Sequence, residues 1–130
     1  MAYLLDAGTL VEVLRAVPSR TLIRRLTSVP SRDRWTSSIA VSQLLVAARR
    51  TQSQKLMKDV IRLVAAVKVA SFDMLSAQAF AKLRATVAPE VDTDDVMMVA
   101  IAVTNDLTLV TRRPADFARY PGLRIEDWTA

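Results

Sequence analysis

Three aspartates of this chain stand where predicted strands end or predicted helices begin. Asp6 directly follows the short apolar run at residues 2–5. Asp95 lies near the start of an apolar helix, and Asp116 follows the apolar strand at residues 107–110. In open α/β sheets, ligands bind at the carboxyl ends of the parallel strands. We therefore expect the three carboxylates to face one crevice.

Carboxylates at separated points of a chain suit a hard divalent cation such as Mg²⁺ or Mn²⁺. Such an ion takes oxygen ligands, usually one or two carboxylates, and completes its shell with water and substrate phosphate. It favours phosphodiester hydrolysis because it polarises a phosphoryl oxygen and lowers the pKa of a bound water. The chain has no histidine and no cysteine, which excludes imidazole catalysis, thiol nucleophiles and disulfides. Any chemistry therefore has to come from carboxylates.

Each acid also has a structural explanation that needs no ligand. Helix capping and the helix dipole favour residues such as Asp94 and Asp95 at a helix start. Asp73 is predicted to cap the helix that follows it, and Asp116 could simply begin a turn. Asp6 is harder to explain in this way, because a charge directly after an apolar strand is costly unless it is paired or bound.

Strand and helix patterns alternate along the chain. The predicted strands lie at residues 2–5, 35–39, 67–69, 107–110 and 123–125. The first predicted helix follows Gly8, and the second spans residues 19–26. Two further helices begin near residues 41 and 53, and the last two run from Asp73 to about 86 and from 94 to 103. Apolar strands that alternate with helices are typical of a parallel sheet covered on both faces. The predicted fold class is therefore α/β, with a central, mainly parallel sheet.

Some side chains within these elements carry their own expectations. In the helix after Asp73, residues 75, 79 and 83 are expected to lie on one side. Gln43 lies off the apolar stripe of its helix. Glu90 and Asp92 are expected to be solvated acids of the loop that precedes Asp95.

The composition fits one small domain with its own core. The chain has 130 residues, of which 52% are hydrophobic, so residues 1–130 can bury a core without metals or disulfides. The opening MAYLLDAGTL has no basic start before its apolar stretch and reaches an aspartate at position 6. This fits neither a signal peptide nor a membrane span. We expect a single domain located in the cytoplasm.

The chain is basic, with a formal net charge of +5 and a pI near 10.2. Many of its arginines lie in segments that flank the acidic positions, namely Arg15, Arg20, Arg24, Arg25, Arg32, Arg34, Arg49, Arg50, Arg112 and Arg113. Arginine suits phosphate, and counterion release would supply affinity for a nucleic acid. The alternatives are a solvated basic surface and a surface that docks an acidic protein.

Three stretches of the sequence together resemble the PIN-domain family, and specifically the VapC-type toxins of bacterial toxin and antitoxin pairs. They are the opening YLLDAGTL, the middle SSIAVSQLLVAARR and the closing DDVMMVAIAVTNDLTLVTRRPADFARYPGLRIEDW. The segment SFDMLSAQAFAKLRA also looks like the linking helix of the family. The order and spacing of these motifs make the resemblance specific, and it spans nearly the whole chain.

The resemblance implies a PIN-like three-layer α/β/α fold, a Mg²⁺ or Mn²⁺ site built from acids, and cleavage of single-stranded RNA. It also implies a homodimer and a cognate VapB-type antitoxin that neutralises the toxin. Carried over by position, Asp6 and Asp95 would be metal ligands, and Asp116 a further ligand or the group that orients a water. The substrate would meet Thr111, Arg112 and Arg113.

Three places depart from the family pattern. Gln43 replaces a glutamate of the catalytic set, Ala7 and Gly8 replace a polar pair, and Arg113 stands where asparagine or aspartate is usual. An amide oxygen can still ligate a cation but brings no charge, and Arg113 repels a cation or holds a substrate phosphate. Two hypotheses follow, an active nuclease and a degenerate PIN domain that binds RNA or protein without turnover. The number of replacements favours natural divergence over one engineered silencing substitution.

Overall fold

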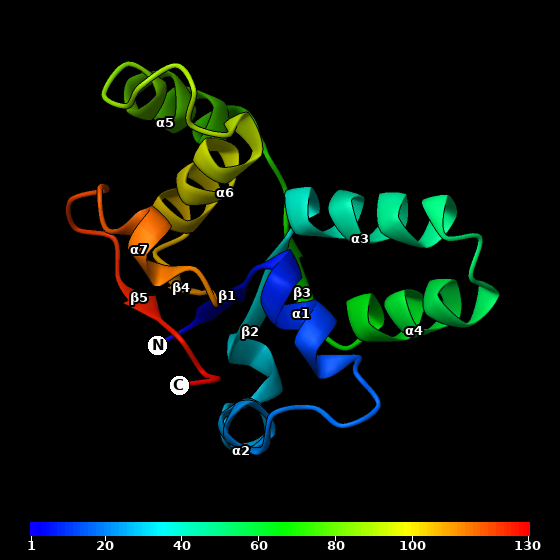
Figure 1. The fold of residues 1–130 in the computed structure, drawn as a ribbon. Coiled ribbons are helices and arrows are strands. Elements are labelled where there is room, and N and C mark those ends of the chain that lie inside the picture. Colours follow the sequence, from blue (N-terminus) through cyan, green and yellow to red (C-terminus); the bar gives the residue numbers. More distant parts are fainter.

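Five parallel strands form the centre of the molecule. The computed structural model describes all 130 residues. The strands are β1 Tyr3–Leu5, β2 Arg34–Ser37, β3 Lys68–Ala70, β4 Thr108–Val110 and β5 Ile125–Glu126, in the spatial order β3-β2-β1-β4-β5. All four strand pairs are parallel. The first strand is therefore central, and its carboxyl end lies between those of β2 and β4 (Figure 1).

Helices cover both faces of this sheet. They are α1 Ala7–Val13, α2 Arg20–Ser28, α3 Ser38–Arg50, α4 Gln54–Ala65, α5 Met74–Arg84, α6 Thr93–Thr104 and α7 Pro114–Phe117, with a 3-10 turn at Ser31–Asp33. Side chains alternate across a strand, so neighbouring residues Leu4 and Leu5 enter opposite layers of the core. The predicted α/β class and three-layer arrangement are confirmed.

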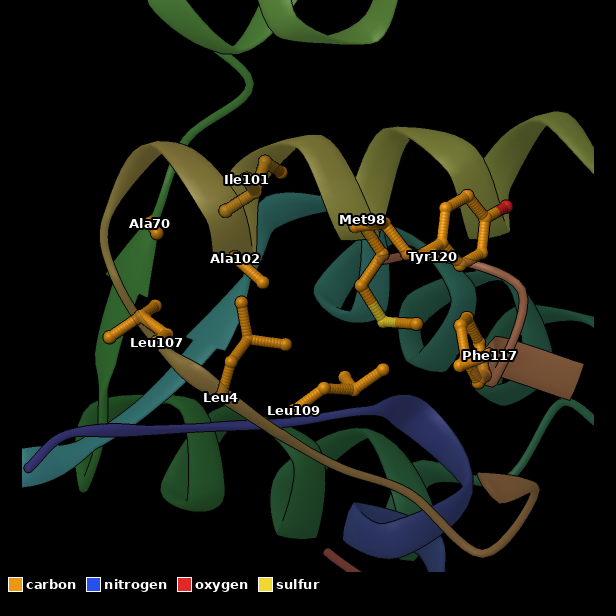
Figure 2. Packing of buried hydrophobic residues seen from close by; sticks show 10 residues of the cluster. Leu4, Ala70, Met98, Ile101, Ala102, Leu107, Leu109, Phe117 and Tyr120 are labelled. Carbon is orange, nitrogen blue, oxygen red and sulfur yellow. The ribbon is translucent and has the colours of Figure 1, made fainter. Parts of the chain in front are cut away.

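One core cluster packs α6 and the α7 region onto the sheet. Figure 2 shows Leu4 and Leu109 from the strands lying beneath Met98 and Ala102 of α6, with Phe117 at one end. Six of the 12 residues of α6 are buried, among them the run from Met98 to Ala102, because α6 packs against both the sheet and α5. The second cluster joins the opposite face of the sheet to α1, α2, α3 and α4.

Short polar side chains define the helix starts. Ser37 Oγ accepts a hydrogen bond from the Ala40 amide at 3.0 Å, and Asp73 Oδ1 accepts one from the Ser76 amide at 2.9 Å. The cap predicted at Asp73 is confirmed. The Asp94 amide donates to Asp92 Oδ1 at 2.8 Å, so Asp92, which is exposed as expected, also caps α6.

Some predicted element boundaries were wrong. Ile39 belongs to α3 rather than to a strand, because the Ser37 cap begins the helix at Ser38 and not near residue 41. The last strand lies at Ile125–Glu126, later than the predicted 123–125, where β5 pairs with β4. Leu75, Ala79 and Leu83 lie on one side of α5, as their spacing predicts, where they line a hollow with Val103 of α6, and Leu75 is 62% exposed there. No helix combines the length and apolar character required to cross a membrane.

Candidate active site

Asp6 is held where β1 turns into α1. Its backbone amide donates to the Val110 carbonyl at 3.1 Å, which continues the pairing of β1 with β4. Its Oδ1 accepts the Thr9 amide at 2.8 Å and so caps α1, while Thr9 Oγ1 donates to the Val110 carbonyl at 3.2 Å. The residue is only 4% exposed. One carboxylate oxygen is therefore used by the fold, and the other makes no hydrogen bond.

A small hollow opens beside Asp6 at the carboxyl edge of the sheet. Its volume is about 30 Å³, enough for a water molecule or a bare ion. Segments far apart in the sequence line it: Asp6, Ala7, Gly8, Ile39, Gln43, Asp94, Asp95, Met98 and Arg113. The crevice expected from the strand ends is thus formed by Asp6 and Asp95. Asp116 does not line it.

Arg113 connects the acids around this hollow. Its Nη1 and Nη2 donate to the two carboxylate oxygens of Asp95 at 3.1 and 3.0 Å, and Nη1 also donates to Asp116 Oδ2 at 3.2 Å. The guanidinium carbon lies 5.2 Å from the centre of the Phe117 ring. The hydrogen bonds to Asp95, with smaller contributions from the charge of Asp6 and from Asp116, raise the pKa of Arg113 further above its usual value. Arg113 therefore acts as a permanent cation at the edge of the hollow.

Gln43 lies in the second turn of α3 and faces the start of α6. Its Nε2 donates to Asp94 Oδ2 at 3.1 Å. The amide is thus engaged with Asp94, the acid one position away from the predicted ligand Asp95. No three acidic side chains of the chain come together in a group that could hold one metal ion. The structure brings Asp6 and Asp95 to one hollow but leaves Asp116 outside it, bound to Arg113.

Comparison with known proteins agrees with this arrangement. The family model described as PIN domain matches residues 3–123. The chain belongs to the PIN domain family. It is 26% identical over 132 residues to the tRNA(fMet)-specific endonuclease VapC of Salmonella typhimurium, and the match covers 98% of both proteins. The resemblance to VapC-type PIN domains seen in the motifs is therefore confirmed.

Solved structures show the same likeness. The crystal structure of DNA-bound VapBC from Salmonella typhimurium superposes with a TM-score of 0.80 at 25% identity, over 98% of each chain. VapBC-1 from nontypeable Haemophilus influenzae gives a TM-score of 0.83 at 22% identity, over the whole of both chains. The second likeness, at this identity, shows that the fold is the same.

The donor atoms of this PIN domain fit a divalent ion in kind. Mg²⁺ binds oxygen and commonly takes only one or two carboxylates. Asp6 and Asp95 supply two from the same hollow, and the unbonded oxygen of Asp6 is available. Arg113 opposes such an ion, because its positively charged guanidinium is already hydrogen-bonded to both carboxylate oxygens of Asp95.

The residues after β4 differ in what they can reach. Thr111 is completely buried, and its Oγ1 accepts a hydrogen bond from the Arg113 amide at 3.0 Å. It therefore holds the loop that presents Arg113. Arg112 lies away from the hollow, because its Nη1 donates to Glu12 Oε2 at 3.3 Å. Of the three residues predicted to meet substrate, only Arg113 lines the hollow.

Glu12 is buried between two arginines, an arrangement that the sequence did not predict. The residue is buried, yet its carboxylate accepts hydrogen bonds from Arg15 at 3.1 Å, Arg112 at 3.3 Å and the Ser19 amide at 3.1 Å. It joins the end of α1 to the start of α2 and to the loop after β4. The only signal in the sequence was an arginine three residues after a glutamate, a spacing that also occurs on solvated helices.

The Glu12 cluster makes the stability of the fold depend on pH. The pKa of Glu12 is lowered mainly by the hydrogen bond from Arg15. The hydrogen bond from the Ser19 amide and the positive charge of Arg112 lower it further. The contribution of ionised Glu12 to stability is therefore complete above its pKa in the unfolded chain, about 4.3. It is lost as the pH falls through the lower pKa of the folded state. We expect thermal melts to show a Glu12→Gln variant less stable than the parent at pH 7, with the difference shrinking below about pH 4. A constant difference down to about pH 2 would contradict this assignment.

Proposed function

We propose that this PIN domain is a VapC-type endoribonuclease toxin that cleaves single-stranded RNA with Mg²⁺ or Mn²⁺. One observation carries the proposal. Asp6 from the end of β1 and Asp95 from the first turn of α6 line one hollow at the carboxyl edge of a parallel sheet. This is the edge where such sheets bind ligands. The similarity to an endonuclease over 98% of the chain supports the same chemistry.

Asp6 and Asp95 are the residues that would hold the ion. When bound, the ion supplies a polarised phosphoryl oxygen and a water of lowered pKa. Arg113 has a guanidinium fork that matches a phosphate group in the same way as it matches Asp95. Asp116 is 54% exposed at its side chain, so it remains accessible to a water that it would orient once Arg113 turns to a phosphate.

A groove beside the hollow offers a path for an RNA strand. It runs along the exposed side of α3, shares Gln43 and Asp94 with the hollow, and has a volume of about 320 Å³. Arg50 lines its other part and supplies a positive charge for a phosphate. The net charge of +5 adds a salt-dependent attraction for the rest of the strand.

The proposed partner is a cognate VapB-type antitoxin, because several relatives of the same fold were solved as VapBC complexes. We also propose a homodimer in the cytoplasm. An apolar hollow between α5 and α6, lined by Leu75, Leu83 and Val103, provides exposed surface that an assembly would cover.

Replacing Asp6 by asparagine tests the proposed activity. Asparagine still caps α1 but removes the charge that the ion needs. Loss of a group that only supports a metal ligand costs up to ~100-fold in activity, so loss of the ligand Asp6 itself should lower Mn²⁺-dependent cleavage by more than ~100-fold. The measurement is cleavage of labelled single-stranded RNA by purified protein free of antitoxin. Asp73→Asn is the matched control, because Asp73 caps α5 through the same kind of bond far from the hollow. Equal cleavage by the Asp6 variant and the parent would refute the role of Asp6.

A second candidate function rests on the same site. Arg113 covers Asp95, and Gln43 brings no charge, which favours a PIN domain that binds RNA without cutting it. In this case the purified protein would retain RNA with an affinity that falls steeply as salt rises, yet cleave no RNA at any Mn²⁺ concentration. Cleavage that Asp6→Asn abolishes would exclude this candidate.

A further inference from the structure

Arg113 differs from the other basic residues in how many acids it holds. Arg25 and Arg124 each pair with one acidic residue, and Lys55 pairs within its own helix. Arg113 contacts two acids on two different helices, Asp95 on α6 and Asp116 on α7. Its fork covers both oxygens of Asp95, whose side chain is 17% exposed. The arginine is therefore seated in the acidic site.

Several contacts hold this guanidinium in place. The loop that carries it is fixed by the hydrogen bond from the Arg113 amide to buried Thr111, and by Pro114, which begins α7. The ring of Phe117, completely buried, lies 5.2 Å below the guanidinium carbon. These contacts therefore place the guanidinium beside Asp95 in this structure.

We propose that Arg113 is the resident cation of this site, closing the hollow between Asp6 and Asp95 against divalent ions until its side chain turns away. The inference rests on the proposed function only for the kind of ion that would otherwise bind. Its physical basis is that one carboxylate cannot give the same oxygens to a guanidinium and to a metal, and that the two cations repel each other.

The closed arrangement is reversible because half of the Arg113 side chain is exposed. Its relative exposure is 49%, and rotation about its side-chain bonds can release Asp95 without moving the buried Thr111 or Phe117. Exposed and half-exposed ion pairs are individually weak in water. A phosphate group is the chemistry that would draw the guanidinium away, since it accepts the same two parallel hydrogen bonds.

Metal binding tests this inference without any measurement of RNA cleavage. The full chain and the variants Arg113→Asn and Arg113→Lys are titrated with MnCl₂ by calorimetry, and melted in EDTA and in Mn²⁺. We expect Arg113→Asn to bind Mn²⁺ about 100-fold more tightly than the parent, the effect of one nearby unit charge. Its melting temperature should fall in EDTA, where the acids repel, and rise with Mn²⁺. Arg113→Lys should lie between them, because lysine keeps the charge but not the fork.

The control is Arg24→Asn, which removes the same charge from an exposed position of α2. It should leave Mn²⁺ affinity unchanged. Tight Mn²⁺ binding by the parent, equal to that of Arg113→Asn, would overturn the inference, as would unchanged affinity in both Arg113 variants. If Arg113→Asn does not fold, Arg113→Lys decides alone. Tighter Mn²⁺ binding than that of the parent supports the inference, and unchanged Mn²⁺ affinity overturns it. A variant that binds Mn²⁺ tightly but cuts no RNA supports the inference and counts against the proposed nuclease.

Discussion

Replacing Gln43 by glutamate is expected to raise the affinity of the chain for Mn²⁺ by roughly a hundredfold. Gln43 lies at the hollow and donates to Asp94 at 3.1 Å, so the new carboxylate would add a negative charge beside Asp6 and Asp95. A unit charge at about 4 Å with an effective dielectric near 20 contributes up to ~4 kcal/mol, which solvent and repulsion between carboxylates reduce. A divalent ion gains more from this charge than the singly charged Arg113 does.

The Gln43→Glu substitution should have opposite effects with and without metal. In EDTA, the introduced carboxylate and that of Asp94 repel each other where a hydrogen bond existed, so the melting temperature should fall. With Mn²⁺ present it should recover or exceed that of the parent. Gln54→Glu is the control, because it adds the same charge at an exposed position at the start of α4. If both variants gain equally in Mn²⁺ affinity, net charge and not the position of Gln43 is responsible.

Truncating Phe117 to alanine is expected to lower the free energy of unfolding by about 3–5 kcal/mol. Phe117 is completely buried in the cluster of Leu4, Met98 and Leu109 shown in Figure 2, and its loss leaves a cavity there. Because domains of this size are stable by only about 5–15 kcal/mol, a large part of the total would disappear. Urea unfolding followed by circular dichroism gives the measurement.

The site should change along with the core. Phe117 lies under the Arg113 guanidinium, so the Phe117→Ala variant should also hold Arg113 less firmly and bind Mn²⁺ more tightly than the parent. Phe80→Ala is the comparison, because Phe80 is half-buried on α5 and packs edge-on against Phe72 away from the hollow. It should destabilise the chain less and leave Mn²⁺ affinity as it was. Equal losses of stability in the two variants would contradict the assignment of Phe117 to the central core.

Much of the fold could be read from the order of apolar and polar residues. Short apolar runs that alternate with helical periods identified the parallel sheet, since only strands covered on both faces can be so uniformly apolar. The element ends were less certain, because a cap such as Ser37 or Asp92 acts through one hydrogen bond whose partner depends on the local backbone. Leu75, Ala79 and Leu83 share one side of α5 as their spacing predicts, but helical spacing does not say how deeply each residue is buried, and Leu75 is 62% exposed.

The sequence by itself determined the place of the acidic site in this PIN domain. Asp6 follows the carboxyl end of β1, and Asp95 lies in the first turn of α6, the helix that leads back into the parallel strand β4, so chain order places both at the carboxyl edge of the sheet. Only the tertiary structure decided which groups pair there. The hydrogen bonds of Arg113 to Asp95 join residues 18 positions apart in the sequence. The hydrogen bond of Gln43 to Asp94 spans 51 positions, and that of Arg112 to buried Glu12 spans 100. Such pairs depend on side-chain directions within the packed fold, which periodicity and spacing do not specify.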